Sequence, residues 1–204
     1  KKLLILDTKV ASACLLIILL FAGQNFGQNK TGTTIGQFLK IEPSSRIVGL
    51  GNAGASLSGE ISSVFYNPAS LGRLQGTDIQ FTFNKWLADI TYNYMAAGIN
   101  VEGIGTFALV GTLLNSGEMD VRTVENPLGT GEKFTVKNLA LGLGYGLMLT
   151  DRVSVGMQIN YINEEIWHSS LSTFGLNFGV QYQVVEGGLT LGASVSNFGP
   201  GAAY

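Results

Sequence analysis

The sequence predicts an all-β protein with the architecture of an antiparallel transmembrane β-barrel, and three observations lead to this prediction. From Thr77 onward, runs of about ten residues alternate apolar and polar side chains, the pattern of half-buried strands. The polar positions hold Gly, Ser, Thr, Asn and Gln, whereas charged residues gather between the runs. The joins between successive runs alternate between short and long. An apolar face toward lipid, an uncharged polar face toward a lumen and unequal joins are typical of outer-membrane barrels.

The composition restricts the classes of function that are open to the chain. Of the 204 residues, 46% are hydrophobic and only 13% are charged, about half the charged share of a soluble domain. The formal net charge is −2 and no stripe of Lys and Arg is present, which argues against a nucleic-acid partner. One cysteine and one histidine leave little material for a disulfide scaffold or a metal site. We therefore expect no nucleic-acid partner, no metal and no other cofactor.

Residues 1–28 have the pattern of a secretory signal peptide. Lys1 and Lys2 precede an apolar run over residues 10–22, and a small, polar stretch follows over residues 23–28. The alternative is a membrane anchor, but a spanning helix needs about 20 apolar residues, more than this run provides. We expect the segment to be removed, together with Cys14, as the protein crosses the inner membrane.

Residues 29–76 show little alternation and predict a plug or periplasmic segment. Gly49, Gly51 and Gly54 match the spacing of a phosphate-binding loop, but no βαβ unit follows and no acidic residue completes a ribose site. The same glycines suit close packing of a small-residue segment inside a barrel. In the sequence Phe65–Ala69, Pro68 holds Asn67 in an extended conformation, and the chain turns at Asn67, Pro68 and Ala69 toward the first strand.

Residues 77–204 supply the strands of the barrel. In the first strand Ile79, Phe81 and Phe83 share one face, opposite Asp78, Gln80, Thr82 and Asn84. A soluble sheet would show Lys, Glu and Arg on its second face, because that face meets bulk water. The alternative is a fully internal sheet of a large soluble protein. The seven expected strands cover residues 77–84, 89–100, 103–115, 135–149, 152–162, 171–184 and 189–197.

The lengths of the joins predict how the strands are oriented across the membrane. The tight joins are 101–102, 150–151 and 186–188, whereas 116–134 and 163–170 are long. Because periplasmic turns are short and outside loops are longer, we expect the two long joins to face the exterior. Trp86 and Trp167 would then lie at the outer rim, where aromatic residues meet the membrane interface. The alternative for both tryptophans is ordinary core packing.

Seven strands do not close a single-chain bacterial barrel, because such barrels have an even number of strands. Residues 197–204 contain Pro200 and several glycines and read as a loop, not as a closing strand. We therefore expect an incomplete barrel or a part of a longer precursor.

Four short motifs resemble those of a known family. They are Phe38–Ile41, Ser45-Arg46, Gly49–Gly54 and, above all, Phe65–Ala69 with its Asn-Pro-Ala turn. They look like the N-terminal region of the PorV/PorQ family, which is related to FadL-type barrels, and the resemblance extends over residues 37–200. It implies a fourteen-stranded barrel with an N-terminal plug in the outer membrane of a Bacteroidota-type cell. It also implies a role in the type IX secretion system, with secretion-system proteins or the C-terminal signal domains of exported cargo as partners, beside the outer-membrane lipid.

No motif indicates an enzyme. His168 is near Glu164 and Glu165 in the sequence, but all three fall in an expected loop, and a lone exposed histidine is seldom catalytic. We expect no catalytic residues. Two functions from different classes stay open, a secretion partner that presents its outside loops to a protein and a FadL-like channel for small hydrophobic molecules. A structural outer-membrane protein is a third. The Gln, Asn, Ser and Thr of the lumen face favour a wet interior over an apolar ligand.

Overall fold

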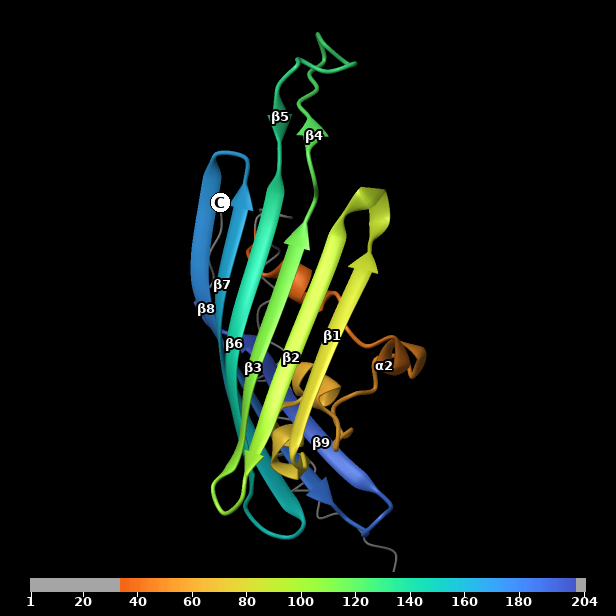
Figure 1. Ribbon diagram of the computed structural model, residues 1–204, viewed down its shortest axis with the longest axis vertical. Helices are drawn as coiled ribbons and strands as arrows, with labels where there is room; N and C mark the ends of the chain where they lie inside the picture. Colours follow the sequence, from red (N-terminus) through yellow and green to blue (C-terminus); the bar gives the residue numbers. More distant parts are fainter. Residues whose placement is uncertain (1–33, 201–204) are drawn as a thin grey trace, which may run out of the picture. The chain divides into compact units, whose positions relative to one another are not determined.

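The protein is all-β and is built on one antiparallel sheet. A computed structural model describes residues 34–200, so the expected signal peptide (residues 1–28) lies outside the described residues. Seven strands pair in the order β1-β2-β3-β6-β7-β8-β9, as the sequence predicts (Figure 1). Their bounds are β1 Thr77–Lys85, β2 Thr91–Val101, β3 Gly105–Asn115, β6 Val136–Met148, β7 Val153–Ile166, β8 Ser169–Gln183 and β9 Thr190–Phe198.

The plug segment, residues 34–76, lies against one face of this sheet in short helical turns. Ser44 caps the first turn of α2 by accepting a hydrogen bond from the Ile47 backbone nitrogen, and Asn67 caps η3 with Pro68 at its first position. Frequent Gly, Ser and Pro keep each turn short. Among the described residues, no helix has the length and apolar character needed to cross a bilayer. The helical turns are η1 Gln37–Lys40, α2 Ser45–Gly49, η2 Ile61–Phe65, η3 Pro68–Arg73 and, between β1 and β2, η4 Leu87–Asp89.

The inner face of the sheet, which meets the plug segment, holds the core. Apolar residues of the plug segment, among them Phe38, Ile61 and Leu71, pack against Tyr92 and Tyr94 of β2 and their neighbours on β3 and β6. The core therefore lies between a helical segment and a sheet. It does not lie between two stacked sheets.

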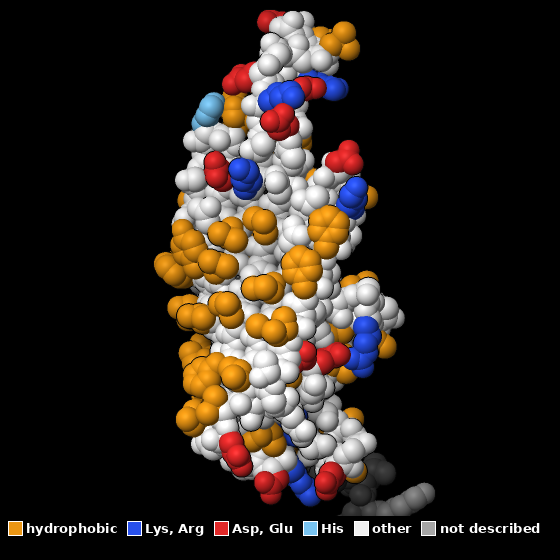
Figure 2. All heavy atoms as spheres, viewed as in Figure 1, with side chains coloured by type: hydrophobic (Ala, Val, Ile, Leu, Met, Phe, Trp, Pro, Cys, Tyr) orange, Lys and Arg blue, Asp and Glu red, His pale blue; other side chains and the backbone are white. Residues whose placement is uncertain are grey.

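The outer face of the same strands is apolar and exposed. Ile79 is 68% exposed, Phe81 67% and Leu143 64%, although all three belong to regular paired strands. Figure 2 shows a broad region of hydrophobic side chains along the strands, with most charged side chains toward the two ends and one further charged group beside the region. The faces predicted from the period-2 pattern are therefore present, and it is the apolar face that is open.

The long join at 163–170 is not a loop, and this prediction was wrong. β7 and β8 continue to Ile166 and Ser169, so only Trp167 and His168 form the turn. Asn163 pairs with Ser172 in the ladder and donates a side-chain hydrogen bond of 2.9 Å to its hydroxyl. Backbone hydrogen bonds form a β-ladder whether or not the side chains are apolar. The two strands therefore extend past the point where the apolar alternation ends.

Two other regions also differ from the prediction, a connection between strands and the end of the last strand. Residues 116–134 form a long connection as expected, but it contains a small ladder, β4 (Met119–Asp120) paired with β5 (Lys133–Phe134). At the C-terminal end of the sheet, β9 extends one residue past the expected strand 189–197, because Phe198, expected in a loop, pairs with Leu176 of β8 across a register shift.

Candidate functional site

The Asn-Pro-Ala turn is docked on the inner face of the sheet, over β6, β7 and β8. Asn67 is fully buried, and its amide nitrogen donates to the carbonyl oxygens of Ala55 at 2.7 Å, Val180 at 3.2 Å and Ala193 at 3.3 Å. Its amide oxygen accepts a hydrogen bond of 2.9 Å from the backbone nitrogen of Ala69. One side chain thus joins the turn to another loop of the plug segment and to strands β8 and β9.

A row of glycines on the sheet receives this turn. Gly146 pairs with Gly156, and Gly156 pairs with Gly179, so the three lie side by side on β6, β7 and β8. A Cβ at Gly156 would lie 2.2 Å from the Pro68 carbonyl oxygen, and one at Gly179 would lie 1.8 Å from the Asn67 amide oxygen. The plug backbone therefore rests directly on the sheet backbone, an approach that only glycine permits.

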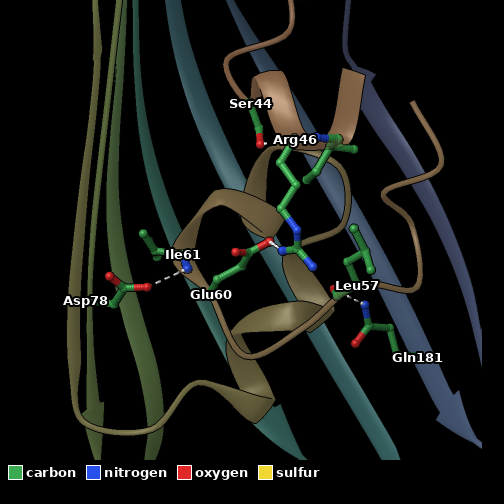
Figure 3. A network of polar contacts seen from close by, with 8 residues as sticks. Ser44, Arg46, Leu57, Glu60, Ile61, Asp78 and Gln181 are labelled. Atoms are coloured by element: carbon green, nitrogen blue, oxygen red, sulfur yellow. Dashed lines mark hydrogen bonds and ion pairs between the residues drawn. The ribbon is translucent and has the colours of Figure 1, made fainter. Parts of the chain in front are cut away.

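Side chains of the sheet also hold the plug segment at both sides. Asp78 of β1 accepts a hydrogen bond of 2.8 Å from the Ile61 backbone nitrogen, and Gln181 of β8 donates one of 2.8 Å to the Leu57 carbonyl (Figure 3). Arg73, at the end of η3, donates to the Gln183 side chain at 2.9 Å and to the Arg152 carbonyl at 2.8 Å. The plug segment is therefore fixed to the first strand of the sheet and to its far side.

The glycine-rich stretch of the plug segment does not pack as expected. Gly49 and Gly51 are exposed, and a Cβ at either would meet nothing within 4 Å, so the prediction of close packing is wrong for both. Gly51 has a φ of +67° and follows Leu50, the C-cap of α2, and this helix lies beside β1 in Figure 1. Gly54 is buried, and a Cβ there would lie 2.4 Å from the Tyr66 ring. Only Gly54 is used for close approach.

Trp86 and Trp167 lie at the same end of the sheet. Trp86 follows β1 and is 43% exposed, whereas Trp167 begins the turn between β7 and β8 and is 44% exposed. The Trp167 ring centroid is 6.5 Å from that of Phe134 in β5 and 4.7 Å from that of His168. Neither tryptophan is part of the core described above.

The β4–β5 hairpin presents apolar side chains at this same end. Val124 is 100% exposed and Leu128 is 94% exposed, both in the loop that joins the two short strands. At the base of the hairpin Lys133 donates to Glu118 at 2.9 Å, and this hydrogen bond lowers the pKa of the Glu118 carboxyl. The hairpin is thus a defined projection from the sheet.

The acidic residues near His168 do not form a site with it. Glu164 belongs to β7, is 5% exposed and accepts a hydrogen bond of 2.7 Å from the Gly36 backbone nitrogen, so the loop position predicted for it was wrong. His168 is exposed, and its imidazole is 4.0 Å from Glu132. Within residues 34–200, no group of three or more His, Cys, Asp or Glu side chains is placed to hold a metal ion.

Comparison of the sequence with protein-family models and with curated proteins found no match. The resemblance to the PorV/PorQ family therefore depends on the four motifs of the plug segment alone.

Proposed function

We propose that the chain is an outer-membrane β-barrel protein of a bacterial cell, with the outer face of its sheet in contact with lipid. The observation that carries the proposal is the exposed apolar face. Soluble monomers seldom expose an apolar patch of more than a few hundred Å². Here such side chains recur on all seven strands, for example Phe83, Met95, Leu109, Leu141, Ile159, Phe178 and Val195.

The lengths of the strands suit a bilayer. A membrane-spanning strand needs about 9–11 residues, and the seven strands have between 9 and 15. Most charged side chains in Figure 2 lie beyond the apolar region at its two ends, and Trp86 and Trp167 lie at one of those ends. This order of apolar band, aromatic rim and charged ends is the order expected across a membrane.

The proposal requires that the sheet close into a ring. Its edges are β1 and β9, and a sheet in lipid leaves no edge unpaired, because each free backbone group would be costly there. Further strands must therefore pair with both edges. A FadL-like barrel of fourteen strands, which the family resemblance implies, would supply them.

We propose type IX protein secretion as the process that this barrel serves, by binding exported cargo or by anchoring components of the attachment complex. The fixed plug segment and the projecting hairpin with Val124 and Leu128 support a protein partner more than a transported solute. A FadL-like channel for small hydrophobic molecules is the second candidate, and the resemblance of the Asn-Pro-Ala turn favours it equally.

Cysteine labelling in intact cells tests the membrane topology. Val124→Cys, at the tip of the hairpin, should react with a membrane-impermeant maleimide in whole cells. Asp151→Cys, in the turn at the opposite end of the sheet, is the matched control and should react only after the outer membrane is permeabilised. Equal labelling of both in intact cells, or a protein that stays soluble without detergent, would contradict the proposal.

Deletion of the gene tests the secretion role separately. Cargo with C-terminal signal domains should accumulate in the periplasm of the deletion strain, and the full-length gene should restore its export. Normal export with impaired uptake of small hydrophobic molecules would instead support the channel.

A further inference from the structure

A cavity of about 210 Å³ lies between the plug segment and the inner face of the sheet. Three side chains of the plug segment, Leu39, Phe65 and Tyr66, form one wall. The other walls come from β3, β6, β7, β8 and β9. None of the described residues that line the cavity is charged.

Two buried amides form a polar floor. Gln158 and Asn160 of β7 are 5% and 6% exposed, and the Gln158 amide nitrogen donates to the Asn160 amide oxygen at 2.6 Å. The Gln158 amide oxygen has no hydrogen-bond partner among the described residues. A buried acceptor without a partner is destabilising, so this atom is suited to accept a hydrogen bond from a ligand.

A glycine on the neighbouring strand leaves space for these two amides. A Cβ at Gly142 of β6 would lie 2.4 Å from the Asn160 amide oxygen and 2.7 Å from the Gln158 amide nitrogen. The bare backbone at this position therefore allows both amides to lie across the neighbouring strand. Asn177 of β8, also in the lining, is held by accepting a hydrogen bond of 2.7 Å from the Asn197 backbone nitrogen.

The aromatic wall is fixed in position. The Phe65 ring packs edge-on against Tyr66, with 5.1 Å between centroids, and against Tyr94, with 6.0 Å. The Tyr66 hydroxyl donates to Glu42 at 2.7 Å. Burial, and after it this carboxylate, raises the pKa of Tyr66, so the phenol stays neutral. A rigid aromatic wall opposite a floor of amides suits a ligand with one apolar and one polar side.

We propose that this cavity binds a small, uncharged molecule with several hydroxyl or amide groups, about the size of a monosaccharide. Amides both donate and accept, which matches a ligand with hydroxyl groups. A charged ligand would lack a counter-charge in the lining, and a purely apolar one would leave the Gln158 oxygen unpaired. The volume is below the roughly 300 Å³ of the smallest drug-sized pockets, which sets the limit of size. The proposal does not depend on the secretion role.

Titration followed by saturation-transfer NMR tests this site. The full chain is purified in an amine-oxide detergent, because a sugar-based detergent would compete. Glucose and N-acetylglucosamine are the probes, and octanoate and glucose 6-phosphate are the comparisons. We expect a neutral sugar to bind and neither comparison to do so. Binding of octanoate alone, or of none of the four, would overturn the proposal.

Two variants locate the binding. Gln158→Met keeps the side-chain length and removes the amide, so it should weaken sugar binding about tenfold. Gln80→Met is the matched control, because Gln80 of β1 is on the same face and outside the lining, and it should leave binding unchanged. Unchanged binding in Gln158→Met would place the sugar elsewhere and refute the site. If this variant does not fold, Gly142→Ala decides in its place, with loss of binding expected.

Discussion

The two faces of this sheet are built by opposite rules, although every strand contributes to both. On the inner face polar residues and glycines are buried, as with Gln181 and Gly146, while on the outer face Leu143 and Met157 are exposed. Burial therefore does not follow hydrophobicity in this protein. What each face touches decides its composition, a protein segment on one side and, in our proposal, hydrocarbon on the other.

The two faces also differ in the kind of fit that they require. At the inner face, backbone meets backbone, and one added methyl group would overlap the carbonyl of Pro68. If the outer face contacts lipid, as we propose, it needs only apolar character, since lipid adapts to shape. We therefore expect the outer face to tolerate changes of size and not of charge, and the inner face to tolerate few changes of size at all.

The largest effect should follow a charge at mid-height on the outer face. Leu143→Arg should destabilise the protein in lipid by about 2–4 kcal/mol, the range for a cation near the middle of a bilayer. Leu149→Arg, in the turn after β6, should cost about 1 kcal/mol or less, because the charge reaches the interface. Equilibrium unfolding in vesicles measures both, and equal costs would mean that the outer face does not contact hydrocarbon.

Removal of the Asn67 amide should have the next largest effect. Asn67→Ala deletes four hydrogen bonds inside the plug interface and should destabilise the protein by about 2–3 kcal/mol. The control is Asn163→Ala, which loses an exposed bond to Ser172 and should cost about 0.5–1 kcal/mol. Denaturant titration followed by tryptophan fluorescence would show the difference, and similar midpoints would mean that the turn is not an anchor.

A methyl group added on the inner face should reduce stability by an intermediate amount, whereas one added on the outer face should change it little. Gly156→Ala should destabilise by about 1–3 kcal/mol, because the plug segment must move away. Gly111→Ala, on the outer face of β3, meets only Leu141 at 3.8 Å and should change stability by about 0.5 kcal/mol or less. Limited proteolysis of residues 34–76 reports the displacement, and equal protection in both variants would argue against close docking.

The smallest effect should be a pH response confined to the β4–β5 hairpin. Lys133 lowers the pKa of Glu118 from 4.5, so the ordering due to this pair is present above pH 4.5 and is lost as pH falls through the lowered pKa. Glu118 raises the pKa of Lys133 from 10.5, so the ordering is lost again as pH rises through the raised pKa. The amide protection factors of the hairpin, which are corrected for the intrinsic pH dependence of exchange, should follow these limits, while those of the sheet stay constant. Glu118→Gln should abolish the response.

The sequence predicts the strands and their faces well, because alternation is a local property. It ends β7 too early, since Asn163 and Glu164 continue a ladder without apolar side chains. It also identifies the turn at Asn67 through the fixed geometry of Pro68. The glycine row escapes prediction, because Gly146, Gly156 and Gly179 become neighbours only through strand register, which no single strand encodes. The exposure of Gly49 and Gly51 cannot be predicted from the sequence for a similar reason, since their packing depends on where the plug segment lies.

The glycine row has a consequence for assembly. If β7 slipped by two residues along its neighbours, the faces would stay correct, but Ser154 or Gln158 would lie under Pro68 in place of Gly156. Neither side chain leaves room for the turn there, so a mispaired hairpin cannot be completed by the N-terminal residues. The plug segment therefore favours the native register of β7 over a slip of two residues.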